Sequence, residues 1–263
     1  MTALIDADSL LYKVAFAVEA TTVWNENEYE CGIDEEKEVT YDSDFPMMCS
    51  HIDGLIENIL VATDCDDYEL HLTSNSNFRD SNPLGYKDNR KELRKPMYFK
   101  ELKEYLINEH KATLNEGIEA DDMVVYLKTK YYDKYILCAI DKDVLYQTEG
   151  THYNYNTDEI ITVNYIDTIK FKYFQCLAGD PSDGYKGCKN IGKVKAKAIV
   201  DSIDVRSKDF EYELYNLVLE TFIKQGHDEE YLLNTLRLAD MHQFDGEKIV
   251  EICKPTSTIN TGL

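Results

Sequence analysis

The sequence has 263 residues, enough for one large domain or for a catalytic domain with a small appendage, and enough to bury a sizeable core. Hydrophobic residues make up 43%, an ordinary share, but 50 acidic residues against 28 basic ones leave a net charge of −22. A protein this acidic does not attach indiscriminately to membranes or polyanions. The overall charge therefore disfavours nucleic-acid binding unless basic residues are concentrated locally.

The seven cysteines include no C-x-x-C pair, so we expect neither a disulfide framework nor a zinc knuckle. They are typical of buried thiols in a reducing compartment. The chain reaches Asp6 too soon for a signal peptide, and no apolar run approaches the roughly 20 residues of a bilayer-spanning helix. We expect a cytoplasmic protein with no membrane partner.

Two acids follow the first apolar segment. Residues 2–9 predict a short buried strand that delivers Asp6 and Asp8 to its carboxyl end, and residues 10–16 predict a helix. In parallel α/β sheets, ligands bind at this edge.

An acid-rich region follows, with 15 Asp or Glu between residues 26 and 69 and a single basic residue, Lys37. Its first half, as far as Asp44, predicts an exposed loop or hairpin. Residues 47–62 have helical apolar spacing, and residues 68–74 alternate like a strand. We interpret the acids as a solvated surface rather than a binding site for a partner.

The charge changes sign in the next segment, residues 87–103, which contains seven basic residues and three acidic ones. These are Lys87, Arg90, Lys91, Arg94, Lys95, Lys100 and Lys103. Pro96 divides the run, which predicts a helix, a break and a second helix over residues 97–108. Such a stretch in an acidic protein favours a phosphate ligand over a solvated helix face, and Tyr86 is available to stack on a base.

Three carboxylates crowd the start of a central helix. Glu119, Asp121 and Asp122 precede the apolar residues of 123–127. Acids at a helix N-terminus complement its dipole, but three within four residues repel one another unless a cation screens them. This pattern indicates a functional site.

A near-continuous apolar run over residues 134–140 predicts a strand buried on both faces, and Asp141 and Asp143 follow it. Residues 153–155 and 160–163 predict two further strands. The resulting order of strands and helices predicts an α/β fold, with an open and mostly parallel sheet covered by helices on both faces.

The C-terminal part is helical and locally basic. Residues 171–178 predict a helix that leads into a glycine-rich loop containing Asp180 and Asp183, and a second helix begins directly after Gly192. Seven lysines and only these two acids lie within residues 170–197. A glycine turn before a lysine-flanked helix suits a phosphodiester backbone. Residues 212–224 and 231–239 predict helices that cover this module.

Eight acids lie at predicted strand ends or in adjoining loops: Asp6, Glu119, Asp121, Asp122, Asp141, Asp143, Asp180 and Asp183. In a parallel sheet these ends converge on one edge. Without cations such a cluster is costly, whereas Mg²⁺ or Mn²⁺ takes oxygen ligands and bridges carboxylate to phosphate. Two ions about 4 Å apart would support in-line phosphoryl displacement without a protein nucleophile.

These motifs together resemble the 5′-nuclease superfamily of flap endonucleases and 5′→3′ exonucleases, and in particular its short bacteriophage members. The resemblance covers roughly residues 1–200 and lies in Asp6, Tyr86 to Arg90, Glu119 to Asp122, Asp141 to Asp143, Gly179 to Asp183 and Gly192.

The resemblance implies a PIN-like catalytic domain over residues 1–168, within which residues 79–112 form a helical arch or clamp for the 5′ single strand. A helix–three-turn–helix module over residues 169–245 would grip duplex DNA, with a K⁺ ion as a further candidate ligand, and residues 246–263 would form a tail. The implied partners are DNA with 5′ ends, flaps or nicks, with RNA–DNA hybrid as a further candidate. The protein would act as a monomer, in the host cytoplasm if a phage encodes it.

The resemblance also implies roles for individual residues. Asp6, Glu119 and Asp121 would favour one Mg²⁺ or Mn²⁺ ion, Asp122, Asp180 and Asp183 would favour the other, and Asp141 and Asp143 would lie near both. Lys87 and Arg90 would contact the scissile phosphate, and Tyr86 would stack on the terminal base. The remaining DNA contacts would come from Lys91, Arg94, Lys95, Gly187, Lys189, Gly192, Lys193, Lys195 and Lys197.

The chain departs from the family pattern at two positions. Ser74 stands where the family has an aspartate after its second strand, which would weaken the first metal site or leave a water in its place. Asn190 replaces the glycine of the helix-hairpin turn, and asparagine tolerates left-handed backbone angles better than most residues.

Two other functions fit part of the pattern. A haloacid-dehalogenase-like phosphatase would use Asp6 as nucleophile and Asp8 as acid, with Thr73 or Ser74 as its hydroxyl and an aspartyl phosphate as intermediate. A DNA-fork-binding protein that has lost catalysis would explain Ser74. The phosphatase leaves the acids of residues 119–122 unexplained, and the binding protein would keep acids that repel DNA.

Overall fold

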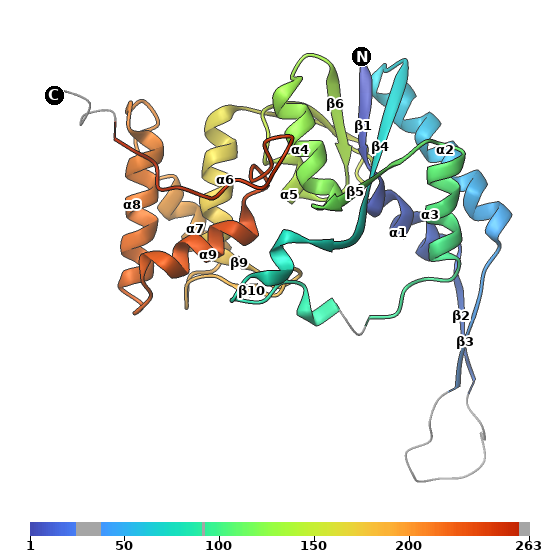
Figure 1. The fold of residues 1–263 in the computed structure, drawn as a ribbon, viewed down its shortest axis with the longest axis horizontal. Helices are drawn as coiled ribbons and strands as arrows, with labels where there is room; N and C mark the ends of the chain where they lie inside the picture. Colours follow the sequence, from blue (N-terminus) through green and yellow to red (C-terminus); the bar gives the residue numbers. More distant parts are fainter. Residues whose placement is uncertain (25–37, 91–92, 258–263) are drawn as a thin grey trace, which may run out of the picture.

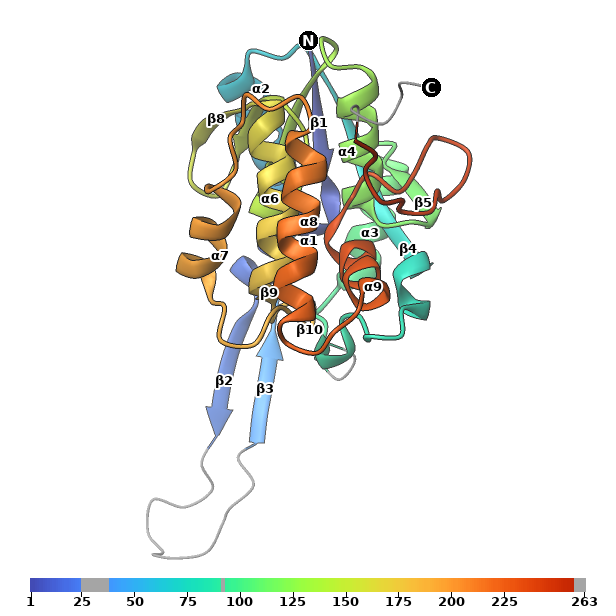
Figure 2. The same ribbon diagram turned by 90° about the vertical axis from the view of Figure 1, so that its left-hand side faces the viewer.

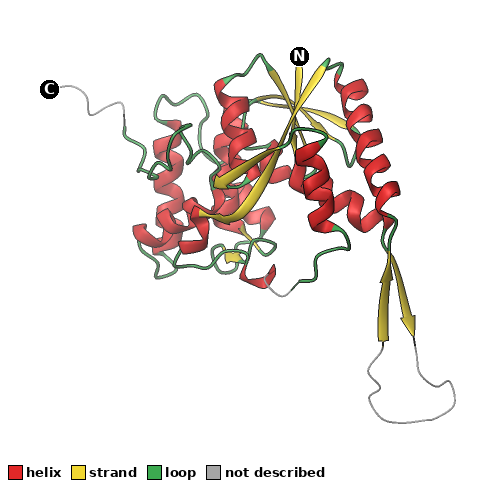
Figure 3. Ribbon diagram, turned by 45° about the vertical axis from the view of Figure 1, so that its right-hand side comes forward, coloured by secondary structure: helices red, strands yellow, loops and turns green. Residues whose placement is uncertain are grey.

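The computed structural model describes residues 1–24, 38–90 and 93–257. Its centre is a sheet, drawn in yellow among the red helices in Figure 3. The sheet has six strands in the order β5-β4-β1-β6-β7-β8, of which only β8 runs antiparallel to its neighbour. The strands are β1 (Thr2–Asp6), β4 (Asp67–Asn77), β5 (Thr113–Gly117), β6 (Tyr135–Ala139), β7 (Gly150–Asn154) and β8 (Glu159–Val163). The predicted α/β fold with a mostly parallel sheet is confirmed.

Helices cover both faces of the sheet because its central strands are apolar on both sides. In β1, Ala3 and Ile5 pack into the core that α1 (Ala7–Val18), α2 (Phe45–Thr63) and α3 (Phe99–Asn108) share. Leu4 points to the opposite face, where α4 (Ala120–Lys130) and α5 (Lys142–Leu145) complete a second core. This alternation along an extended strand leaves Asp6, at its end, directed to the carboxyl edge.

Four helices form a separate cluster at one end of the sheet (Figure 1). They are α6 (Tyr165–Ala178), α7 (Lys193–Val200), α8 (Phe210–Ile223) and α9 (Glu229–Ala239), with the short strands β9 (Gly179–Asp180) and β10 (Tyr185–Lys186) between α6 and α7. Their core includes the buried side chains of Tyr173, Tyr215 and Phe222. The module boundaries given above stay predictions, although α6, which carries much of this core, already begins at Tyr165.

The helical module is joined to the sheet domain by buried polar contacts. Gln147, which follows α5, donates to the carbonyl of Ala239 at 2.7 Å, and Asn82 donates to the carbonyl of Asn234 at 2.9 Å. Because these contacts satisfy carbonyls at and near the end of α9, they fix the module beside the carboxyl edge of the sheet.

A hairpin of β2 (Ala20–Trp24) and β3 (Glu38–Asp42) extends away from the body (Figures 1 and 2). At its base, Arg94 forms an ion pair with Glu19 and lies 3.5 Å from the ring centre of Tyr41. The predicted hairpin is thus present in its described part, and the basic segment is attached to it.

The basic segment itself differs from the prediction. The 3₁₀ turn η1 (Phe78–Ser81) precedes it, and the described residues of the segment before Pro96 contain only the 3₁₀ turn η2 (Asp88–Arg90), so the predicted helix there is wrong. The arch or clamp over residues 79–112 stays a prediction. The helix after Pro96 is α3. Strand β5 was not predicted, because Asn115 is its one buried residue and the apolar alternation is weak. None of the helices in the described ranges has the length and apolar content to span a bilayer.

Candidate active site

A cavity of about 980 Å³ opens at the carboxyl ends of β1, β4 and β6. Its acidic lining residues are Asp6, Asp8, Glu119, Asp121, Asp141, Asp143 and Asp183. Its basic lining residues are Lys13, Lys87, Arg90, Lys95, Lys100, Lys103 and Lys142. Acidic and basic side chains from distant parts of the chain therefore line one cavity.

Asp6 ends β1 and caps α1. Its carboxylate accepts from the backbone of Asp8 at 3.0 Å and from the hydroxyl of Ser9 at 2.5 Å. Burial and the adjacent charge of Asp8 raise the pKa of Asp6 to about 7. A carboxyl held in this way ionises at neutral pH only with difficulty unless a cation is nearby.

Burial and a neighbouring carboxylate also raise the pKa of two other carboxyls of the cavity. Burial and the charge of Asp6 raise the pKa of Asp121 well above its usual value. Burial and the charge of Asp141 raise the pKa of Asp143 to about 7, and Asp143 shares a hydrogen bond with Asp180. Asp180 is fixed in turn by the backbone and hydroxyl of Ser182, at 2.7 and 2.5 Å.

This donor set fits a hard divalent cation. Its lining donors include carboxylate oxygens from several chain segments, which Mg²⁺ and Mn²⁺ prefer. Burial raises the pKa values of Asp6, Asp121 and Asp143 even though Lys142 binds Asp143 at 3.0 Å, so the surrounding protein offsets their charges only in part. A bound cation would remove that cost.

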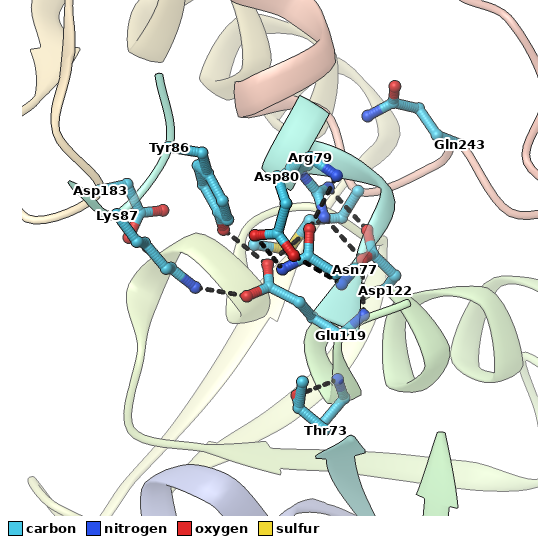
Figure 4. Close-up of polar contacts among 12 residues, drawn as sticks. Thr73, Asn77, Arg79, Asp80, Tyr86, Lys87, Glu119, Asp122, Asp183 and Gln243 are labelled. Carbon is cyan, nitrogen blue, oxygen red and sulfur yellow. Dashed lines mark hydrogen bonds and ion pairs between the residues drawn. The ribbon is translucent and has the colours of Figure 1, made fainter. Parts of the chain in front are cut away.

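Glu119, by contrast, is surrounded by donors (Figure 4). Lys87 donates to its Oε1 at 2.7 Å, and Tyr86 and Arg79 donate to its Oε2 at 2.5 and 3.4 Å. Burial alone would raise the pKa of Glu119, but Lys87 and Arg79 outweigh it and lower the pKa. Glu119 is therefore ionised and already paired.

The same lysine also approaches Asp183. The Nζ of Lys87 lies 3.9 Å from Asp183, and Arg90 donates to that carboxylate at 3.0 Å. The backbone of Lys87 adopts a left-handed conformation with φ of 51°, and its amide donates to the carbonyl of Asp183 at 2.8 Å. This unusual conformation for a lysine is held by the loop that carries Asp183.

Two predicted site residues lie buried, away from the cavity lining. Asp122 does not line the cavity: it is fully buried and binds Arg79 through two hydrogen bonds of 2.6 Å each. Tyr86 is only 6% exposed, with its ring in the core of the helical module and its hydroxyl on Glu119, so it offers no face to a base. Local sequence does not show that Arg79 and Glu119 lie against these side chains, so their roles in metal and DNA binding stay predictions.

Across residues 1–24, 38–90 and 93–257, no three His, Cys, Asp or Glu side chains stand close enough together to hold a metal ion. Three of the predicted acids are held in ion pairs, since Lys87 binds Glu119, Arg90 binds Asp183 and Arg79 binds Asp122. Metal ligation by the predicted acids stays a prediction. It requires Lys87 and Arg90 to release their carboxylates.

The predicted DNA-contacting residues of the basic segment have different surroundings. Lys91 lies outside the described residues. Arg94 is engaged by Glu19. Lys95 is exposed, lines the cavity and lies 4.7 Å from the ring centre of Phe99. Of the two described residues, Lys95 is the one that lines the cavity, in a position that suits a substrate contact.

In the helical module, Lys189, Gly192, Lys193 and Lys195 are exposed around the start of α7, and Lys197 is exposed in its last turn. Lys197 pairs with Asp201 and Lys195 donates to the carbonyl of Asn190. Asn190 has the left-handed conformation expected of it, with φ of 60°. Gly187 serves packing, since a Cβ there would lie 2.3 Å from backbone atoms of Gly179 and Leu177.

No known family profile matches this sequence, and no curated protein matches it. Solved structures do match. The D15 protein of bacteriophage T5, crystallized with metal ions, is 16% identical over 92% of this chain and 89% of its own, with a TM-score of 0.56. T5 5′-exonuclease with bound zinc also has a TM-score of 0.56, at 18% identity over 92% and 89%. The catalytic core of Rad2 in complex with DNA has a TM-score of 0.50, at 13% identity over 92% and 79%.

The chain has a 5′-nuclease fold.

Several side chains at the cavity of this 5′-nuclease fold were not predicted as site residues. Tyr12 and Phe16 stack on each other along α1 at 6.2 Å between ring centres, and Phe99 of α3 lies 4.9 Å from Tyr12. Phe16 is 50% exposed. The i, i+4 spacing of Tyr12 and Phe16 in the first helix was a usable signal, since it places both rings on one helix face.

Proposed function

We propose that this chain is a divalent-metal-dependent 5′→3′ exonuclease and 5′ flap endonuclease that hydrolyses phosphodiesters of DNA and leaves 5′-phosphate products. The observation that carries the proposal is the single cavity in which acids from the carboxyl edge of the sheet face a set of lysines and an arginine. Acids alone would repel a nucleic acid, and lysines alone would bind it without cutting. Substrates would be 5′ ends, flaps and nicks, with RNA–DNA hybrids as further candidates.

Asp6, Asp121, Asp141 and Asp143 would hold Mg²⁺ or Mn²⁺, together with Glu119 and Asp183 once these are released from Lys87 and Arg90. Bound divalent ions would supply charge neutralisation at the phosphate and activation of a water for in-line attack. Asp180, a further predicted ligand, lies beside Asp143 and is held by the backbone and hydroxyl of Ser182.

The chain's own cations would position the substrate. Lys87 and Arg90 line the cavity and bind Glu119 and Asp183, so they would be free to reach a phosphate once these acids bind a cation instead. Lys95, Lys100 and Lys103 extend the basic wall along α3 and the segment before it. Tyr12 and Phe16 provide an aromatic surface beside that wall, on which the base next to the scissile phosphate would stack.

Duplex DNA would bind at the start of α7. Gly192 caps this helix without a side-chain hydrogen bond, which leaves the first-turn amides without a side-chain acceptor. Lys189, Lys193 and Lys195 are exposed around them. The K⁺ ion at the preceding turn stays a prediction.

The test uses end-labelled flap, nicked and RNA–DNA hybrid substrates with Mg²⁺, Mn²⁺ or EDTA. We expect metal-dependent release of 5′-phosphorylated products, and we expect Asp141→Asn to abolish cleavage while sparing DNA binding. Intact substrate under conditions where the protein binds it would instead support the fork-binding alternative. Release of phosphate from a phosphomonoester, with a covalent phosphate adduct detected on Asp6, would support the phosphatase.

A further inference from the structure

Asp8 reaches the end of a strand to which it does not belong. It lies in the first turn of α1, two residues after Asp6, and its side chain lines the cavity. Its Oδ2 accepts from the backbone amide of Thr73 in β4 at 3.0 Å. The carboxylate of Asp8, which follows β1 in sequence, therefore lies at the end of the neighbouring strand β4.

The end of β4 has no acid of its own. Thr73, Ser74 and Asn75 line the cavity there, between the acids that follow β1 and those at the start of α4. Hydroxyl and amide groups are weaker ligands than a carboxylate for a hard cation, because they carry no charge. The one carboxylate fixed on this part of β4 is that of Asp8.

Thr73 holds this arrangement rigid. Its hydroxyl accepts from the amide of Ala120 at 2.9 Å, at the start of the helix that carries Asp121, and its carbonyl accepts from Lys103. One residue therefore joins α1, α3, α4 and β4 at the cavity edge. The Asp8 carboxylate is held at a defined place relative to Glu119 and Asp121 by fixed contacts, as a metal ligand must be.

A purely structural role for Asp8 would need only the hydrogen bond to Thr73. Asparagine could make that bond through its carbonyl oxygen, without the charge. The side chain of Thr73 also hydrogen-bonds to this carboxylate, and both contacts lower a pKa that burial raises. Neither contact requires a negative charge, so the bonds to β4 do not explain why a charged side chain is placed in the cavity.

We propose that Asp8 supplies, from α1, the carboxylate that Ser74 does not supply from β4, and that it ligates the divalent cation together with Asp6 and Asp121, directly or through one ordered water. This inference rests on the proposed function. It makes Asp8 a part of the metal site, and it removes Ser74 as a reason to expect an inactive protein.

The experiment measures the affinity of the full-length protein for Mn²⁺ by isothermal titration calorimetry. Asp8→Asn keeps the hydrogen bond to Thr73 and loses the charge, so we expect at least a tenfold weaker affinity, on the scale of lost metal-site partners. Adding Ser74→Asp to Asp8→Asn should restore much of the loss, because it returns a carboxylate to the same cavity wall. Asp66→Asn is the matched control, since its side chain is 96% exposed at the opposite edge of the sheet.

The outcomes separate this inference from the proposed function. Unchanged Mn²⁺ affinity in Asp8→Asn, alongside weakened affinity in Asp141→Asn, overturns the role of Asp8 alone. Failure of the unaltered protein to bind Mn²⁺ overturns both. A crystal of the unaltered protein soaked in Mn²⁺ gives a second test that does not depend on a variant folding: anomalous density near Asp8 supports the inference, and density only at Asp141 and Asp143 contradicts it.

Discussion

Arg79 donates two hydrogen bonds of 2.6 Å to the carboxylate of Asp122, and both side chains are buried. The same guanidinium donates to the carbonyl of Asp240 at 3.0 Å. Asp122 also accepts from the backbone of Glu119 at 3.2 Å, at the start of α4. The pair thus connects the first turn of α4 to the residue that follows α9. An acid that sequence places among metal ligands instead joins the sheet domain to the helical module.

The first prediction separates these two roles of Asp122. Asp122→Asn leaves the buried charge of Arg79 with only its longer contact of 3.4 Å to Glu119, so the free energy of unfolding should fall by about 3 kcal/mol, the low end for a broken buried pair. Affinity for Mn²⁺ should remain close to that of the unaltered protein. Urea denaturation and calorimetric titration measure the two quantities.

The control replaces both partners. Arg79→Met combined with Asp122→Leu buries no charge, and it should recover most of the lost stability. If Asp122→Asn were as stable as the unaltered protein but bound Mn²⁺ weakly, Asp122 would be a ligand after all.

A second prediction concerns Lys87, whose ammonium binds Glu119 at 2.7 Å in the absence of substrate. In the reaction we expect it to contact the phosphate, so Lys87→Ala should lower kcat by roughly 10²–10³-fold, the usual cost of one transition-state donor. KM should change little, because the other lysines that line the cavity would still bind the DNA strand. Steady-state cleavage of a 5′-flap substrate gives both parameters.

The left-handed backbone at Lys87 supplies a matched comparison. Lys87→Gly fits that backbone without strain, so it should lose as much activity as Lys87→Ala while being at least as stable. Lys100→Ala, on the same cavity wall, should raise KM rather than lower kcat. Equal kcat losses from Lys87 and Lys100 would mean that Lys87 acts only as one more positive charge.

The third prediction is a pH dependence of metal stabilisation. Asp6 and Asp143 have a pKa of about 7 in the folded protein against 3.8 for an ordinary Asp, so the folded state holds more protons between these values. Without metal, the contribution of these groups to the free energy of unfolding is therefore present below pH 4 and is lost as the pH rises through 7. A bound divalent cation replaces those protons.

Thermal unfolding with and without Mg²⁺ measures this effect. At pH 8, a hundredfold excess over the dissociation constant adds about 2.7 kcal/mol, or roughly 5–10 °C for a chain of this size. At pH 5.5 protons compete for Asp6 and Asp143, and the rise in Tm should be much smaller. Asp66→Asn should behave like the unaltered protein at both pH values, whereas a rise independent of pH would show that the metal does not bind these carboxyls.

Local sequence was sufficient for the parts of the site that follow from strand ends. A buried apolar strand must end at one edge of a parallel sheet, so Asp6 and Asp141 could be brought together from their positions alone. The same holds for the start of α7 after Gly192, and for the left-handed Asn190, where the chemistry of one or two residues decides the backbone.

The remainder depends on contacts between distant residues, which a local pattern does not contain. Nothing around Asp122 indicates that Arg79 faces it, and nothing around Tyr86 indicates that its ring packs into the helical module. The basic segment was misjudged for a related reason. A run of lysines and arginines suits a helix by propensity, but the loops fixed by Asp183 and Glu19 determine its path here.

The last prediction concerns the DNA-binding role of the helical module. Lys193 opens α7 and is exposed beside the uncapped amides of that helix, so it would neutralise one phosphate of a bound duplex. Lys193→Ala should weaken duplex binding by a similar factor for every sequence, and the slope of log affinity against log salt should become less steep by about one. Lys130→Ala is the control, because Lys130 is exposed at the far end of α4, away from the cavity edge, and its loss should leave the slope unchanged. Fluorescence anisotropy of a labelled duplex at several salt concentrations measures the slopes, and equal slopes for the two variants would place the duplex elsewhere on the protein.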